Sequence, residues 1–233
     1  MLDCISVQTM RESDAWTIAN RVPSLELMYR AAMGVFRAVR WQGRAAILCG
    51  SGNNGGDGFA LAGILKAHGF DCALFTLSDR LSPDAAHYAA LADVPTAPFT
   101  PGCLDGFDIL VDCLLGTGFQ GDVRKNYRAA IEAINASPAF TVSVDINSGM
   151  NGDTGEGGCI VSSDLTVTIG YVKQGLVTEN AGRFIRRLVV APIGIELIRE
   201  EQKIAGAGEW DTLSAHDKQH AILCPPWLDM DPI

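Results

Sequence analysis

The stretch AAILCGSGNNGGDG, residues 45–58, joins a short apolar run to a glycine-rich turn and decides the fold. Gly50, Gly52 and Gly55 spell G-x-G-x-x-G, the dinucleotide-binding fingerprint, and the apolar residues before them are typical of a buried strand. Such a turn lets backbone N–H groups approach a phosphate, and a helix that begins near Asp57 would turn its positive end toward the same anion. The other interpretation is that the glycines only supply turn conformations and that Asp57 caps its helix.

The fingerprint is incomplete for an ordinary dinucleotide site. Such a site needs an acidic residue about 20 positions further on, at the end of the second strand. Asp71 has this separation but precedes the predicted strand 72–77, and Asp79 follows the strand later than the fingerprint prefers. No hydride-transfer site is recognisable either. A nicotinamide-dependent dehydrogenase is therefore disfavoured, and the run NNGGD at 53–57 needs another explanation.

Beyond this turn, short apolar runs alternate with segments of helical periodicity. The pattern predicts helices at 57–68, 83–92 and 126–136, and strands at 44–49, 72–77, 108–112, 140–146, 164–170 and 185–191. The strands are apolar throughout rather than half polar, which indicates a mainly parallel sheet covered on both faces. The sequence predicts a Rossmann-like three-layer α/β/α sandwich.

The two ends of the chain flank this predicted core. Thr9–Glu12 has the pattern of a capping box and predicts a helix ending near Asn20, and a second helix begins around Ser24, so that two helices precede the first strand. A polar helix around 196–204 and a break at 205–208 precede a Pro-rich end, which we expect to be surface packing or a linker stub. We therefore expect one domain over 1–233, made of N-terminal helices (1–43), a Rossmann-like core (44–194) and a C-terminal helix and tail (195–233).

Composition excludes several classes of partner. The 233 residues are 48% hydrophobic and 19% charged, with a formal net charge of -9 and no basic run, which argues against nucleic acid. No apolar stretch approaches the roughly 20 residues of a membrane span. The first 14 residues resemble neither a secretory signal nor a transit peptide, so we expect a cytoplasmic protein. The seven cysteines contain no C-x-x-C pair and are expected to be reduced and mostly buried.

Three polar loops follow predicted strands. Because the carboxyl ends of parallel strands meet at one edge of a sheet, these loops should open on a shared ligand site. Asp112 and Asp145 each end a strand, and a buried carboxylate is costly unless it meets a cation or several donors. Asn54, Asp112 and Ser148 would together offer oxygens suited to a hard cation, although each alone is more often a cap or turn residue.

Four stretches give this pattern a family resemblance: GSGNNGGDG at 50–58, DILVDCLLGTGFQGDVR at 108–124, VSVDINSGMNGDTG at 142–155 and DLTVTIGYVKQGL at 164–176. They resemble the successive motifs of the YjeF N-terminal domain family, of which NNGGD is the most specific. The similarity extends from about Thr9 to Gly194. Members are NAD(P)H-hydrate epimerases, which interconvert the R and S forms of hydrated NADH and NADPH.

The resemblance implies a Rossmann-like domain, usually a homodimer, and a set of site residues. It implies potassium ligands at Asn54, Asp112 and Ser148, with one K⁺ per subunit. The residues implied to contact the substrate are Asn53, Asn54, Gly55, Gly56, Asp57, Gly116, Thr117, Gly118, Phe119, Gln120, Gly121, Asp122 and Asp145. In many organisms this domain is fused to a hydrate dehydratase, so a dehydratase domain or protein is an expected partner.

Inversion of the hydrated carbon, by loss and re-addition of water or by ring opening, needs a proton donor and acceptor. Our hypothesis assigns this role to Asp145.

Some residues depart from the family pattern or remain open in role. The family usually has VDIPSG, whereas this chain has Asn147 in place of the proline, a change expected to loosen the loop. Lys173 either faces the site or is a solvated charge. His216 and His220 are interpreted as a surface pair. A non-catalytic scaffold of the same fold is the alternative, disfavoured by the retained polar residues.

Overall fold

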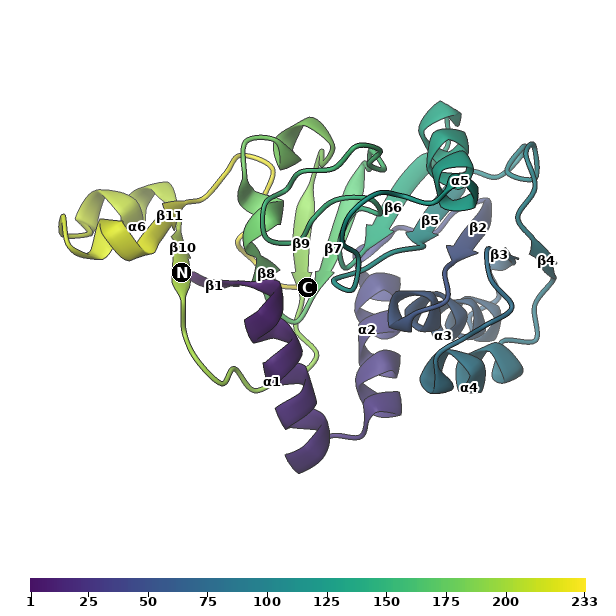
Figure 1. Ribbon diagram of the computed structural model, residues 1–233, viewed down its shortest axis with the longest axis horizontal. Coiled ribbons are helices and arrows are strands. Elements are labelled where there is room, and N and C mark those ends of the chain that lie inside the picture. The colour runs from purple at the N-terminus through teal and green to yellow at the C-terminus, as the bar shows by residue number, and fades with distance from the viewer.

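The computed structural model describes residues 1–233 and has a seven-stranded sheet at its centre (Figure 1). Every pair of neighbouring strands in this sheet is parallel. The strands, in their spatial order, are β4 (Thr96–Pro98), β3 (Asp71–Thr76), β2 (Arg44–Cys49), β5 (Ile109–Cys113), β6 (Phe140–Val144), β7 (Leu165–Ile169) and β9 (Leu188–Ala191). The predicted mainly parallel α/β sandwich is confirmed.

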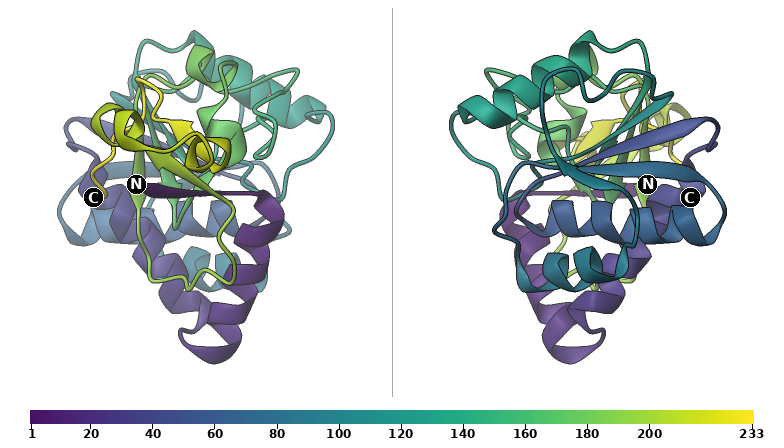
Figure 2. Two further views of the ribbon diagram at one scale, coloured as in Figure 1. Left: turned by 90° about the vertical axis from the view of Figure 1, so that its left-hand side faces the viewer. Right: turned by 90° about the vertical axis from the view of Figure 1, so that its right-hand side faces the viewer.

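Helices cover both faces of this sheet (Figures 1 and 2). Helices α2 (Ser24–Ala38), α3 (Asn53–Ala67) and α4 (Pro83–Leu91) lie on one face, and α5 (Lys125–Ala136) lies on the other. Successive residues of β2 serve both: Ala45 and Ile47 join the core under α2 and α3, whereas Ala46 and Leu48 join the core under α5. Two buried faces explain why these strands are continuously apolar.

The order of the strands predicts a ligand crevice between β2 and β5. The chain begins the sheet at β2, extends it toward β3 and β4, and then returns to add β5, β6, β7 and β9 on the other side of β2. The direction of strand addition therefore reverses between β2 and β5. In doubly wound sheets, ligands bind outside the carboxyl ends of the strands at such a switch point. The glycine-rich turn after β2 and the loop after β5 flank this position.

A second, four-stranded sheet lies beside the first and was not predicted. Its order is β11 (Ala221–Leu223), β10 (Gln202–Ala205), β1 (Leu2–Ile5) and β8 (Val172–Lys173). The prediction that two helices precede the first strand is wrong because β1 comes first, and the polar helix predicted at 196–204 is instead an extended segment that enters β10. Strands of two to four residues carry almost no periodicity, and β1 and β10 pair across nearly the whole chain. The other short elements are α6 (Ala207–Thr212) and the 3-10 helices η1 (Gln174–Val177), η2 (Ala181–Arg183) and η3 (Asp217–His220).

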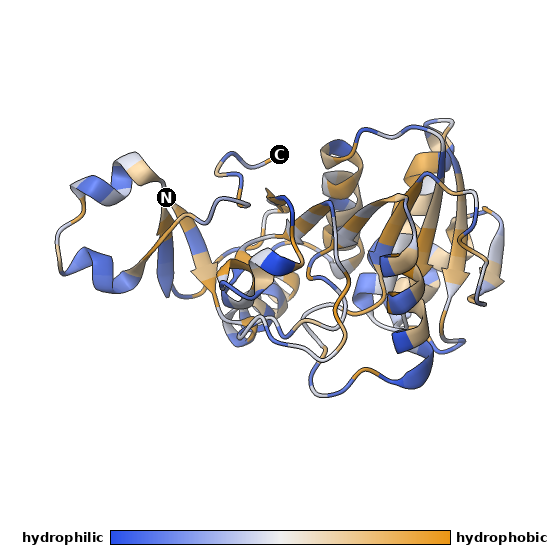
Figure 3. Cartoon of the chain, turned by 90° about the horizontal axis from the view of Figure 1, so that it is seen from above, coloured by the Kyte–Doolittle hydropathy of each residue, from blue (hydrophilic) through white to orange (hydrophobic).

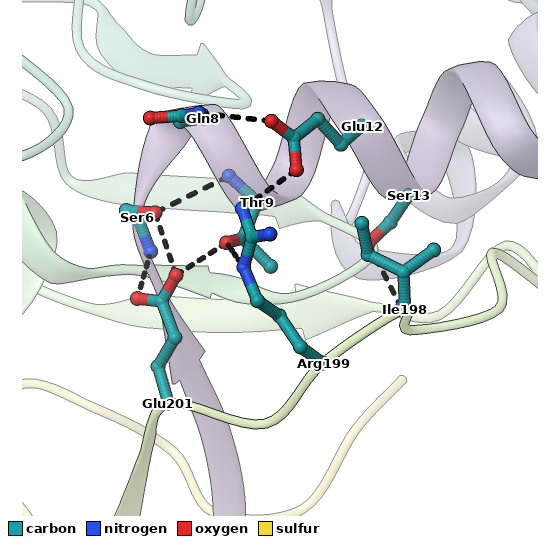
Figure 4. A network of polar contacts seen from close by, with 8 residues as sticks. All are labelled: Ser6, Gln8, Thr9, Glu12, Ser13, Ile198, Arg199 and Glu201. Carbon is teal, nitrogen blue, oxygen red and sulfur yellow. Dashed lines mark hydrogen bonds and ion pairs between the residues drawn. The ribbon is translucent and has the colours of Figure 1, made fainter.

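Helix α1 (Val7–Asn20) is fastened to the C-terminal segment by polar contacts (Figure 4). Its N-cap is Ser6, whose Oγ accepts from the Thr9 backbone N–H at 3.2 Å, so the capping box predicted at Thr9 is wrong. The Thr9 hydroxyl instead bonds Glu201 and Arg199, and Ser13 Oγ accepts from the Ile198 N–H at 3.3 Å. The fully buried hydroxyl face of α1 therefore packs on residues 196–201.

The last residues complete the central sheet. Leu188 of β9 donates to the Trp227 carbonyl at 2.6 Å and accepts from Asp229 N at 2.8 Å, and Ile233 N donates to Val190 at 3.1 Å. This backbone pairing covers the edge of β9, which would otherwise expose unpaired backbone N–H and C=O groups.

Viewed from above, the central strands are the most hydrophobic part of the molecule, and α6 is mostly hydrophilic (Figure 3). All seven cysteines are unpaired. No helix has both the length and the apolar character to cross a bilayer.

Candidate active site

A cavity of about 740 Å³ opens at the carboxyl edge of the central sheet. The turn after β2, the long loop after β5 and the end of β6 form its floor, and α1 and α2 form its walls. Its lining residues are Met10, Arg11, Asp14, Ile18, Ser24, Leu27, Met28, Ala31, Ser51, Gly52, Asn53, Asn54, Asp57, Asp84, Leu114, Leu115, Gly116, Thr117, Gly118, Phe119, Gln120, Asp122, Arg124, Tyr127, Asp145, Ile169, Ile193 and Ile195. The first two polar loops and Asp145, which follows β6, therefore line one site, whereas residues 146–155 of the third loop do not line it.

Helix α3 begins four residues earlier than the sequence predicts. Its N-cap is Gly52, so NNGGD is the first helical stretch, and the interpretation of Asp57 as a cap is wrong. The turn before it is tight: a Cβ on Gly50 would lie 1.9 Å from the Leu114 carbonyl oxygen. Asn and Gly have low helix propensity, which is why the sequence predicts a loop here. The early start turns the backbone N–H groups of the first turn toward the cavity.

Asn54 is the least satisfied polar side chain of the chain. It is 9% exposed, and neither its Oδ1 nor its Nδ2 has a hydrogen-bond partner. A Cβ on Gly116 would lie 3.2 Å from Asn54 Cβ and 3.3 Å from Asp145 Oδ2, so the amide lies beside the start of the loop after β5. A buried amide without a partner costs free energy, which indicates that a ligand or ion completes its contacts.

Asp112 and Ser148 lie beneath this loop. The Asp112 carboxylate accepts four hydrogen bonds, from Ser148 Oγ at 2.5 Å, Ser148 N at 2.9 Å, Ser143 Oγ at 2.9 Å and Leu114 N at 3.2 Å. Burial raises the pKa of Asp112, and these four bonds oppose the rise. Ser148 Oγ also accepts from Leu115 N at 2.8 Å. The pair therefore ties the end of β5 to the end of β6.

Asp145 is held in an unusual conformation at the end of β6. Its φ is +68°, and Ile146 N donates across it to the Val144 carbonyl at 2.9 Å, which closes a γ-turn. This left-handed conformation is strained for a residue with a side chain, and such strain clusters at functional sites. The turn directs Asp145 into the cavity, with its side chain 14% exposed.

Lys173 faces the site, which decides between the two sequence interpretations. Its side chain is 1% exposed, and its Nζ donates to Asp145 Oδ1 at 2.5 Å, to the Ile169 carbonyl at 2.6 Å and to Thr168 Oγ1 at 3.0 Å. No hydrogen bond within the chain engages Asp145 Oδ2. Asp145 therefore presents Oδ2 to the cavity, while the ammonium of Lys173 balances its negative charge on the buried side.

Two further carboxyls line the cavity near Asp145. Burial, followed by the charges of Asp145 and Asp14, raises the pKa of Asp57 well above its usual range, and Lys173 opposes the rise. Burial and the charge of Asp145 likewise raise the pKa of Asp14. Because two carboxyls in different environments separate into proton donor and acceptor, this group is suited to acid–base chemistry.

Asn147 anchors the loop between Asp145 and Ser148. It is fully buried; its Nδ2 donates to the Val161 carbonyl at 2.8 Å and to Ser163 Oγ at 3.0 Å, and its Oδ1 accepts from Thr166 Oγ1 at 2.6 Å. We expected that the absence of proline would loosen this loop. The side-chain bonds of Asn147 instead fasten it to β7 and to the segment before it.

The structure divides the residues predicted to contact the substrate. Asn53, Asn54, Asp57, Gly116, Thr117, Gly118, Phe119, Gln120, Asp122 and Asp145 line the cavity, whereas Gly55, Gly56 and Gly121 do not. A Cβ on Gly55 would lie 2.2 Å from the Gly50 carbonyl oxygen, so Gly55 serves the packing of α3 on the turn. His216 and His220 lie at η3 and are exposed, as expected of a surface pair. No group of three His, Cys, Asp or Glu side chains in the structure could hold a metal ion.

Sequence reasoning missed the contribution of α1. Met10, Asp14 and Ile18 recur every four residues and line the cavity, on a different face from the buried hydroxyls. Their spacing was visible, but only the tertiary structure shows that this face meets the site. Arg11 and Arg124 were also missed, and they are the two basic residues in the cavity wall.

Comparison with known proteins identifies the family. A family model described as YjeF-related protein N-terminus matches residues 24–175, a span that includes both glycine-rich loops, Asp145 and Lys173. The chain belongs to the YjeF_N family. The crystal structure of the yeast YjeF_N-fold protein YNL200c superposes with a TM-score of 0.66 at 20% identity, covering 86% of this chain and 97% of that one. That likeness supports the fold.

Several curated YjeF_N relatives cover most of this chain. "NAD(P)H-hydrate epimerase" of Limosilactobacillus fermentum is 36% identical over 197 residues, 80% of this chain and 95% of that protein. The protein of the same name from Rhodopirellula baltica is 36% identical over 212 residues, 84% of this chain and 87% of that protein. The "Bifunctional NAD(P)H-hydrate repair enzyme Nnr" of Coxiella burnetii is 33% identical over 196 residues, which cover 80% of this chain and 40% of that protein.

Proposed function

We propose that this YjeF_N protein is an NAD(P)H-hydrate epimerase, an isomerase that interconverts the R and S forms of hydrated NADH and NADPH. Relatives of that name match it over nearly their whole length. The observation that carries the proposal is the buried Lys173–Asp145 pair, which leaves Asp145 Oδ2 open to the cavity. A carboxylate held in this way is ready to exchange a proton with a bound hydroxyl.

The chemistry follows from the hydrated ring. Its hydroxyl is on a carbon next to the ring nitrogen, so protonation of the hydroxyl allows water to leave as the nitrogen lone pair forms an iminium. Water then adds to the opposite face and gives up a proton. We assign Asp145 to accept the proton that the added water releases and to stabilise the cationic iminium, because its charge is fixed beside the cavity. Proton exchange with solvent then restores the donor and the acceptor.

Asp57 is the proposed proton donor. Its pKa is raised well above the usual range, first by burial and then by Asp145 and Asp14, which keeps it protonated more readily than a solvated carboxyl. It also lines the cavity. Asp145 instead bonds the buried ammonium of Lys173, so the two carboxyls lie in different environments and are assigned opposite roles.

We further propose a potassium ion held by Asn54, Asp112 and Ser148. The buried Asn54 amide lacks a partner in the chain, and Asp112 has no basic residue paired with it. The serine hydroxyls that now donate to Asp112 can rotate to present lone pairs. A bound potassium ion would supply positive charge under the loop after β5. These residues would then orient that loop and the first turn of α3.

Three expectations about partners and location accompany this function. We propose a homodimer in solution, and a hydrate dehydratase as functional partner, since relatives named as bifunctional repair enzymes carry the matching segment in a longer chain. Seven unpaired cysteines are in keeping with a reducing compartment, for which we propose the cytoplasm.

The test is epimerisation of pure (R)-NADHX in potassium buffer, measured against the spontaneous rate and a sodium control. We expect enzyme-dependent conversion to the S form, and Asp145→Asn should lower turnover far more than binding. A folded wild-type protein that leaves the spontaneous rate unchanged would favour the non-catalytic scaffold instead.

A further inference from the structure

Charge is distributed unevenly around the cavity. Five aspartates and two arginines line it. Four of the aspartates lie close enough to influence one another: after burial, the charge of Asp145 raises the pKa of Asp57 and of Asp14, and Asp84 adds to the rise at Asp14. They form an acidic group around Asp145, where the proposed chemistry takes place, and the fifth aspartate, Asp122, lies in the loop 116–123.

The two arginines lie at the two ends of the glycine-rich loop 116–123. Arg11 of α1 donates from Nη2 to the Thr117 carbonyl at 2.7 Å, near the start of the loop. Arg124 follows the loop directly and is the N-cap residue of α5, without a side-chain cap bond. Both are exposed, and neither forms an ion pair with any residue of the chain. The two guanidinium groups are therefore not engaged by a carboxylate of the chain.

This arrangement suits an anionic group on the ligand. A dinucleotide carries at least two phosphate charges, which the aspartates of the cavity repel. A guanidinium presents several donors in a fixed plane that matches phosphate oxygens. The ring, by contrast, becomes cationic as water leaves, and the aspartates attract it. Arg11 and Arg124, the only basic residues in the cavity wall, are therefore the groups of the cavity that suit the phosphates.

Resting on the proposed epimerase function, we propose that Arg11 and Arg124 bind the phosphate groups of the substrate. The substrate offers phosphate oxygens at two places. The bridging pyrophosphate occurs in both hydrated cofactors, whereas the 2′-phosphate occurs only in hydrated NADPH.

Direct binding tests this assignment. Titration calorimetry with NAD⁺ and NADP⁺ compares the wild type with Arg11→Gln, Arg124→Gln and a matched control, Arg128→Gln, which removes a charge from α5 outside the cavity. Each cavity variant should raise Kd about tenfold, the factor for one charge-assisted bond, and the control less than about twofold. A rise for both ligands assigns that arginine to the pyrophosphate, and a rise for NADP⁺ alone assigns it to the 2′-phosphate.

Equal Kd values in the two cavity variants and the control would overturn the proposal. Because binding needs no turnover, this result is independent of the epimerase assay: an inactive wild type that binds through the arginines contradicts only the proposed function. In the active enzyme the cavity variants should raise KM with kcat unchanged, the signature of lost uniform binding. A fall in kcat at constant KM would contradict the assignment.

Discussion

Replacing Lys173 by methionine removes the ammonium that contacts Asp145 and keeps an unbranched side chain of similar length. The Lys173 side chain is 1% exposed and the Asp145 side chain 14% exposed, so water screens the pair far less than a surface ion pair. The substitution also leaves the Ile169 carbonyl and the Thr168 hydroxyl without their buried donor. It therefore perturbs both the carboxylate in the cavity and the packing beneath it.

The magnitude follows from the geometry. At the 2.5 Å separation of Nζ and Oδ1, the Coulomb attraction is about 7 kcal/mol for an effective dielectric constant of 20. Desolvation of the two charges offsets part of this, and removal of one partner of a buried pair costs about 3–5 kcal/mol in stability. For a chain of 233 residues this corresponds to a fall in Tm of roughly 6–20 °C.

Urea unfolding and epimerisation of (R)-NADHX measure the two consequences. We expect Lys173→Met to lower turnover by about 100-fold or more, since the carboxylate loses its fixed orientation and charge. The double variant with Asp145→Asn should recover part of the stability, because no unpaired carboxylate remains, with a coupling energy of about 1–3 kcal/mol. Strictly additive stability losses, or wild-type turnover in Lys173→Met, would refute this account of the pair.

Three further substitutions test the site. The raised pKa of Asp57 means that the folded protein keeps a proton that the unfolded chain releases, so stability falls as pH rises from the usual carboxyl range toward the folded pKa; Asp57→Asn should remove this slope in thermal melts and abolish turnover. Asn54→Leu should remove any gain in Tm from KCl over NaCl, and a retained gain would place the ion elsewhere. Asn147→Ala should cost about 2–4 kcal/mol in urea unfolding because it leaves buried partners unpaired, and a loss under about 1 kcal/mol would show that the loop needs no anchor.

Much of the central sheet could be predicted because its signals are local. Ala45–Leu48 and Ile109–Val111 are apolar at every position since both faces of each strand are buried, and glycine-rich or polar turns bound them. Parallel pairing then brings the loops after β2, β5 and β6 to one edge. The proximity of Asn54, Gly116 and Asp145 was therefore predictable from order alone, without any distance.

Other features depended on contacts between distant segments. β1 exists because it pairs with β10 and β8, and the buried hydroxyls of α1 are satisfied only by residues 196–201. The start of α3 at Asn53 depends on the approach of Gly50 to the Leu114 carbonyl, against the low helix propensity of NNGG. In each case tertiary packing overrides a weak local preference.

The sequence by itself determined the α/β class, the edge of the sheet that carries the site and the residue types that gather there. It did so because the hydrophobic pattern shows which segments are buried strands and in what order they follow one another. Only the tertiary structure decided that Lys173 pairs with Asp145, that Asn54 is left without a partner and that α1 brings Asp14 and Arg11 to the cavity. Those relations depend on distances between side chains from separate elements. A one-dimensional pattern records the type of each residue but not the partner that compensates its charge or its hydrogen bonds.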